Sequence, residues 1–201
     1  AATEAKIVKM YPAHDAQPIE NAADGTDVAV ICDVTAFHAE GGGQLGDIGT
    51  ITAPTGVIAV NVTKKLPDGA VIMIGSVTEG TVAVGDAVTF AVDKARKMDI
   101  ARNHTATHLM QKALQEVLDD HDHQAGSSQD DKITRFDFTH FSAVTPEELA
   151  EVERRVNEKI VASLPVEIHN LPIEEAKKMG AMALCGEKYG SIVRVVDAGG
   201  W

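Results

Sequence analysis

The periodicity of the sequence changes near Asp93, and this change constrains the fold more than any other feature. Before it, short runs rich in Val, Ile and Thr alternate with turn-forming Gly, Asp, Asn and Pro. The runs are AKIVKM, DVAVICDVTAF, DIGTITA, GVIAVNVTK, AVIMIGSV and DAVTFAVD. β-branched runs at this spacing are typical of small antiparallel barrels and sandwiches. The sequence therefore predicts an all-β domain over residues 1–92.

After Asp93 the pattern indicates a mixed α+β domain over residues 93–201. Apolar residues recur at helical spacing to about Asp120. The polar stretch HDHQAGSSQDD then predicts a loop, and ITRFDFTHF alternates as a strand does.

A second helix is expected to begin beside Thr145, a favourable N-cap, with Pro146 at its first position and acidic residues behind it. This helix runs to about Ser163. The order that completes the domain is strand, short helix and strand, in PVEIHN, IEEAKKMG and SIVRVVDA.

Composition narrows the classes of protein that fit. The formal net charge of −12 disfavours a protein that grips a nucleic acid unaided. No apolar run approaches the roughly 20 residues that span a bilayer, so no membrane association is expected. Cys32 and Cys185 form no C-x-x-C pair, which favours a reducing, cytoplasmic setting. The chain starts without Met and stops at DAGGW, so we expect it to be a fragment of a longer protein.

His104 and His108 are the first candidate site residues. Residues four apart on a helix lie one turn above each other, so both imidazoles can reach one metal ion. Such a pair is more often an ordinary pair of helical histidines than a metal site. A zinc protease of the H-E-x-x-H type would carry a glutamate where Thr105 stands, so that chemistry is disfavoured.

Two further stretches carry weaker signals. GGGQLG satisfies the dinucleotide-binding pattern G-x-G-x-x-G, but a strand follows it where that pattern needs a helix. We therefore interpret it as a tight glycine turn or a place where another backbone approaches closely. QAGS offers an amide and a hydroxyl, Gln124 and Ser127, which could orient a polar substrate group.

The remaining candidate ligands are weaker still. His121, His123 and Cys185 could extend a metal site, although solvated or packed roles are more common for such residues, and Cys32 is expected in the core. No G-x-S-x-G element supports Ser-His-Asp catalysis.

Taken in order, several motifs resemble the editing region of alanyl-tRNA synthetases and of their free-standing editing relatives. The motifs are FHAEGGGQLGDIG, RNHTATHLMQKALQEVL, QAGS, RFDFTHF and GEKYGSIVRVV, which together cover nearly the whole chain. The resemblance implies an α+β fold: a small N-terminal antiparallel β-barrel followed by an editing core built around the two-histidine helix. It also implies hydrolysis of the ester that joins serine or glycine to tRNA(Ala).

The resemblance assigns roles by position. His104 and His108 would bind zinc, whereas Thr105, Gln124 and Ser127 would be the catalytic residues beside the amino acid. Gly42, Gly43 and Gln44 would contact the substrate. The remaining Cys and His ligands would lie beyond Trp201, which would leave half of a zinc site and could leave the isolated chain inactive.

The expected partners are the acceptor end of tRNA(Ala) and other domains of the same synthetase. Three alternatives stay open: a free-standing deacylase of mischarged tRNA(Ala), a non-catalytic tRNA-binding module, and, as the weakest, a metallohydrolase that acts on small molecules.

Overall fold

A computed structural model describes residues 4–118, 124–181 and 189–201 of the chain. Within them the chain forms two compact units, and the boundary falls inside the first helix. The first unit ends at Ala101 and also includes Gln129–Lys132, whereas the second comprises Arg102–Ser128 and Ile133–Trp201. The domain limits predicted from the sequence, residues 1–92 and 93–201, stay a prediction.

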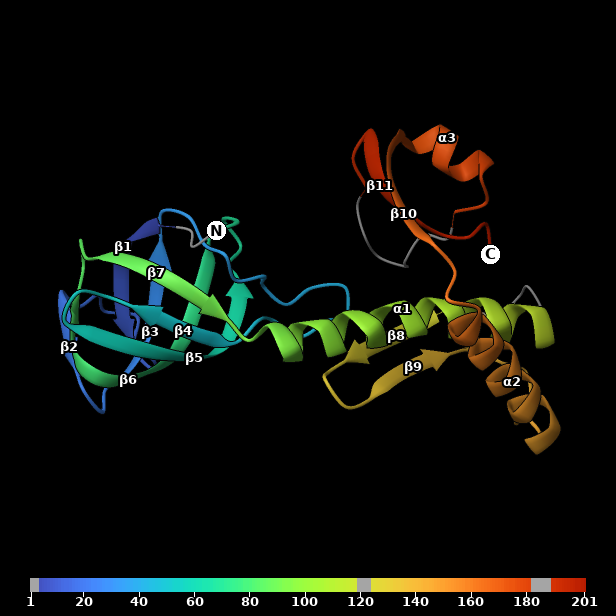
Figure 1. Ribbon diagram of the computed structural model, residues 1–201, viewed down its shortest axis with the longest axis horizontal. Coiled ribbons are helices and arrows are strands. Elements are labelled where there is room, and N and C mark those ends of the chain that lie inside the picture. The colour runs from blue at the N-terminus through green and yellow to red at the C-terminus, as the bar shows by residue number, and fades with distance from the viewer. Residues whose placement is uncertain (1–3, 119–123, 182–188) are drawn as a thin grey trace. The chain divides into compact units, whose positions relative to one another are not determined.

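The first unit is a closed antiparallel barrel (Figure 1). Six strands pair in the order β6-β3-β1-β7-β4-β5, and β5 pairs with β6 to close the ring, while β2 adds to β6 outside it. Closure leaves the ring without free edges and decides between the predicted barrel and sandwich. The strands are β1 (Glu4–Pro12), β2 (Asn21–Ala23), β3 (Asp27–Cys32), β4 (Gly49–Thr52), β5 (Gly56–Lys65), β6 (Val71–Ala83) and β7 (Ala87–Val92).

The barrel core explains why the β-branched runs alternate. Alternate residues of β5 are buried because successive strand side chains point to opposite faces. The interior is aliphatic, and its largest fully buried members include Ile7, Met10, Ile51, Ile58 and Met73. Cys32 packs against this cluster, as the sequence predicts.

The second unit has a mixed architecture. Its elements, some of which begin in or extend into the first unit, are α1 (Lys94–Val117), β8 (Gln124–Gln129), β9 (Thr134–Phe138), α2 (Pro146–Ala162), β10 (Val166–Pro172), α3 (Ile173–Lys178) and β11 (Ile192–Ala198). β8 pairs with β9, and β10 pairs antiparallel with β11. Together with the barrel, this confirms a mixed α+β fold.

The start of α2 follows its sequence signal. The Thr145 hydroxyl accepts a hydrogen bond from the Glu148 N–H, and the Glu148 carboxylate accepts one from the Thr145 N–H. This reciprocal capping box satisfies two backbone donors that the helix cannot pair internally. The helix ends at Ala162, and its C-cap residue Ser163 adopts a left-handed conformation with φ of 50°.

One element differs from the sequence prediction. The stretch predicted as a polar loop forms strand β8 from Gln124 to Gln129. Its residues have low strand propensity, but backbone pairing with β9 supplies hydrogen bonds that outweigh it. β9 is in turn held on the apolar side of the unit, where Phe136 and Phe138 pack against the cluster of Ala113, Leu114 and Val152.

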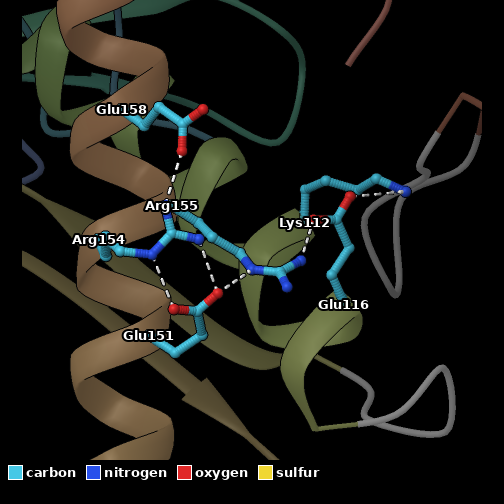
Figure 2. A network of polar contacts seen from close by, with 6 residues as sticks. All are labelled: Lys112, Glu116, Glu151, Arg154, Arg155 and Glu158. Carbon is cyan, nitrogen blue, oxygen red and sulfur yellow. Dashed lines mark hydrogen bonds and ion pairs between the residues drawn. The ribbon is translucent and has the colours of Figure 1, made fainter.

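Charged side chains link α1 to α2 (Figure 2). Arg155 donates to Glu151 on its own helix and to Glu116 on α1, both at 2.8 Å. Arg154 binds Glu151 through two nitrogens and Glu158 through a third.

None of the helices within the described ranges has the length and hydropathy that crossing a membrane needs.

Candidate functional site

Helix α1 presents His104 and His108 side by side. Their ring centroids lie 5.2 Å apart and the ring planes are tilted by 35°. Both side chains are half-buried. Burial lowers the pKa of His108 below its ordinary value of 6.5, so this imidazole is neutral at neutral pH and keeps a lone pair for a proton, a hydrogen bond or a metal ion.

The predicted zinc site can be tested against the ligands present. No group of three or more His, Cys, Asp or Glu side chains with metal-binding geometry occurs in the part of the chain that the structure describes. The secondary candidates His121, His123 and Cys185 lie outside those residues. Two imidazoles fall short of the three or four protein ligands that zinc sites use. The described residues alone therefore do not fit zinc, and we derive no chemical step through it.

Thr105 flanks the histidine pair on the exposed side of α1. Thr107, by contrast, is buried and its hydroxyl donates to the carbonyl of Asn103 at 2.9 Å. The Thr134 hydroxyl donates to the same carbonyl at 3.1 Å, which ties the start of β9 to the turn of α1 that carries His104. The Asn103 carbonyl thus holds the helix in place beside the histidines, and no sequence pattern predicts this role for Asn103.

Strand β8 carries the other two candidate catalytic residues. Gln124 and Ser127 are both half-buried, and the Oε1 atom of Gln124 is buried without a hydrogen-bond partner among the described residues. Strand alternation places residues three apart on opposite faces. Gln124 therefore shares the face of Gly126, where a β-carbon would lie 3.1 Å from Asp137 Oδ2, and Ser127 lies on the other face.

The glycine-rich segment, residues 41–46, forms the tight turn that the sequence predicts. The Gly41 and Gln44 backbones exchange two hydrogen bonds of 3.1 and 3.0 Å. Gly42 and Gly43 have φ of 59° and 81°, which other residues adopt at a cost. Gly42 is exposed, while Gly43 and Gln44 are half-buried. This segment belongs to the first unit and the histidine pair to the second.

Sequence reasoning missed two residues that hold the glycine-rich segment. Asp47 is buried and binds Lys97 of α1 through an ion pair of 2.6 Å. Gln129, at the end of β8, pairs with Gln44 as an isolated parallel bridge. An acidic residue at the head of a strand that is otherwise apolar, in GDIG, was the available signal for the first. The sequence carries no comparable signal for Gln129.

Comparison with known proteins bears on what this arrangement is for. A family model described as tRNA synthetases class II (A) matches residues 1–96. The alanine–tRNA ligase of Acetivibrio thermocellus is 50% identical over 197 residues, which is 98% of this chain and 22% of that protein. The chain is homologous to a segment of alanine–tRNA ligases.

Other ligases of this name match equally well. The one from Bacillus subtilis is 50% identical over 92% of this chain and 21% of its own length. The one from Geobacillus kaustophilus is 49% identical over 99% of this chain and 22% of its own length. The chain therefore spans about a fifth of the length of the ligases that it matches.

Proposed function

We propose that this chain is the editing part of an alanine–tRNA ligase, and that it hydrolyses the ester in Ser-tRNA(Ala) or Gly-tRNA(Ala). The observation that carries the proposal is the pair of neighbouring imidazoles on α1, His104 and His108, in a segment homologous to these ligases. A separate hydrolytic site has a physical reason, because a pocket for alanine cannot strongly reject amino acids of nearly the same size and shape.

The reaction needs a positioned water molecule. Its oxygen bonds to the ester carbonyl carbon and gives up a proton, the bond from that carbon to the tRNA oxygen breaks, and the departing tRNA oxygen takes up a proton to become a hydroxyl. A neutral His108 has one free lone pair, which would either accept a hydrogen bond from the water or the substrate's amino group, or bind a metal ion, but not both at once. The Oε1 of Gln124, which has no partner among the described residues, is a second acceptor. Thr105 and Ser127 are proposed to orient the amino acid through their hydroxyls, with Ser127 acting from the face of β8 opposite to Gln124.

Zinc belongs to the proposal as the ion that His104 and His108 would hold with further ligands. It would supply positive charge that organises the pocket or polarises a bound group. Because no group of three or more metal ligands occurs among the described residues, further ligands would have to come from outside them, and the family resemblance implies a Cys and a His. Gly42, Gly43 and Gln44 are proposed to contact the substrate.

The proposed partners are the acceptor end of tRNA(Ala) and the rest of the ligase polypeptide. A net charge of −12 favours binding in which other parts of the ligase hold the tRNA. The relatives reported above are ligases, which supports a setting within a ligase.

One observation favours a second candidate, a tRNA-binding module without catalysis. The described residues contain too few metal ligands for a zinc site. The two candidates differ in a measurable way, because the module would bind tRNA(Ala) without releasing serine from it.

The test is a chimera in which this chain replaces the matching segment of the Bacillus subtilis ligase. Serine release from Ser-tRNA(Ala) and ligation of alanine are measured on the same preparation. We expect release well above that in buffer, and a decrease of roughly tenfold or more with Ser127→Ala, since a lost hydrogen bond to a reacting group costs on that order.

The exposed neighbour Ser128 provides the matched control. Ser128→Ala should leave both release and ligation unchanged. Binding of Ser-tRNA(Ala) with release no faster than in buffer, while ligation of alanine is normal, would overturn the editing proposal in favour of the binding module.

A further inference from the structure

We propose that Lys97 is a positioning residue, which holds the glycine-rich segment in place through the buried carboxylate of Asp47. The inference concerns the first unit alone. Its link to catalysis rests on the proposed function, in which this segment contacts the substrate, but the positioning itself can be measured without any activity.

Asp47 is the fixed point at the end of the segment. Its side chain is 2% exposed, and its Oδ2 accepts hydrogen bonds from Lys97 Nζ at 2.6 Å and from the His38 N–H at 2.8 Å. The Asp47 N–H donates to the His38 carbonyl, and the Asp47 carbonyl accepts from the Thr63 hydroxyl. A carboxylate this buried is costly without a counter-charge, and Lys97 supplies it.

Arg96 and Gly46, which precede Lys97 and Asp47 in the chain, also form a hydrogen bond. Arg96, whose side chain is 17% exposed, donates from one terminal nitrogen to the Gly46 carbonyl at 3.0 Å. Its Nε lies 3.3 Å from Asp131, which follows β8. At Gly46 itself, a β-carbon would collide with the Thr63 carbonyl. Arg96 and Lys97, in the first turns of α1, therefore hold two consecutive residues, Gly46 and Asp47, against β5.

The tip of the segment is held by backbone bonds to Gln129. The Gln129 N–H donates to the Gly43 carbonyl at 2.8 Å, and the Leu45 N–H donates to the Gln129 carbonyl at 3.2 Å. The Gln129 side chain is fully buried, and neither its oxygen nor its nitrogen has a partner among the described residues, so it adds no further bond there. We expect these two backbone bonds to form only while Lys97 and Arg96 hold the base of the segment in place.

The experiment is residue-resolved amide hydrogen exchange on the 201-residue chain. Lys97→Met keeps most of the hydrocarbon stem and removes the charge. We expect exchange at Leu45 and Gln129 to become faster by about tenfold or more, while amides in β1 and β3 change much less. Lys94→Met is the matched control, because Lys94 begins the same helix and is exposed. It should leave these rates unchanged.

Two further variants separate positioning from loss of stability. Lys97→Arg keeps the charge and should retain most of the protection. In an Asp47→Asn background the counter-charge is no longer needed, so Lys97→Met should have a much smaller effect than in the wild type. Equal acceleration throughout the first unit, or no acceleration at Leu45 and Gln129, would overturn the proposal.

Kinetics of the chimera test whether the contact between Lys97 and Asp47 affects the proposed reaction. There, Lys97→Met should raise KM for Ser-tRNA(Ala) more than it lowers kcat, since a displaced binding segment weakens substrate binding first. A change in kcat alone would contradict this link. If even the unaltered chimera releases no serine, the proposed function fails, whereas the exchange result still decides the role of Lys97.

Discussion

The two compact units of this chain are stabilised in different ways. The barrel closes on itself around a continuous aliphatic interior, in which Met10, Ile58 and Met73 are fully buried. In the second unit the buried cluster contains Ala113, Leu114 and Val152, and partly buried aromatic side chains surround it. This unit is also held by the capping box of α2 and by ion pairs that join α1 to α2 (Figure 2).

The difference extends to the surface of the second unit. In the β10–β11 pair, Ile168 and Ile192 are 55% and 68% exposed, so these aliphatic side chains add little to a core. Loosely packed regions open more readily than closed cores. The candidate reacting residues therefore lie in the unit with the smaller buried core, which we expect to open more readily, while the glycine-rich segment belongs to the barrel unit.

Replacement of one isoleucine by alanine in each unit should give the largest difference in stability between the two units. Ile58→Ala removes a fully buried side chain from the barrel and should lower the free energy of unfolding by about 2–5 kcal/mol. Ile168→Ala removes an exposed one and should cost less than about 1 kcal/mol. Chemical denaturation followed by circular dichroism measures both. Equal losses would remove the distinction between the units.

The cap of α2 tests how far the second unit depends on local interactions. Thr145→Ala removes the hydroxyl that accepts from the Glu148 N–H and should destabilise this unit by about 1 kcal/mol. Thr145→Ser keeps the hydroxyl and serves as the control. Exchange of amides in the first turn of α2 reports the loss. Unchanged protection after Thr145→Ala would show that packing alone holds the helix.

Acid should weaken the Arg–Glu network of the second unit, with a smaller effect on stability than the changes above. Hydrogen bonds from Arg154 and Arg155 lower the pKa of Glu151 from 4.5 to about 2. Since the folded pKa lies below the unfolded one, the stabilisation is complete above pH 4.5 and disappears as the pH falls towards 2. Exposed pairs contribute modestly, so the effect should be slight.

Thermal unfolding between those pH values, with Glu151→Gln, measures this contribution. The variant should lose part of the pH dependence, whereas Glu153→Gln on the exposed side of the same helix should behave like the wild type. An identical pH profile for all three proteins would show that the Arg–Glu network adds no stability.

Burial of Cys32 against the barrel core predicts that its thiol reacts slowly. Burial, and secondarily the charge of Asp33, raises the pKa of Cys32 from 9.0 to about 12. The thiolate fraction at neutral pH then falls by on the order of a thousandfold. In a Cys185→Ser variant, iodoacetamide should modify Cys32 very slowly in the folded chain and rapidly in urea. Equal rates would mean that this side of the barrel opens freely.

The sequence predicts most of the fold because the decisive signals are local. Strand alternation, turn glycines and the Thr145–Pro146 start of α2 depend on neighbours in the chain, and the structure confirms them. Strand β8 was missed because its pairing with β9 outweighs a polar sequence. Lys97 and Asp47 are 50 residues apart, so only the folded chain reveals the contact between them.

The sequence predicts less of the candidate site than of the fold. Spacing alone places His104 and His108 on one face of α1, and the structure agrees. Strand alternation, by contrast, separates Gln124 from Ser127, which a loop prediction could not foresee. The roles of these residues and the zinc ion stay predictions.

The most direct test of the account is serine release from Ser-tRNA(Ala) by the chimera with His104→Ala and His108→Ala combined. His169→Ala is the control, because this half-buried histidine lies on β10 beside Glu167. We predict that release falls on the order of a hundredfold in the double variant, while ligation of alanine is unchanged and the control is fully active. Release at the unaltered rate in the double variant would contradict the assignment of the histidine pair to the reaction.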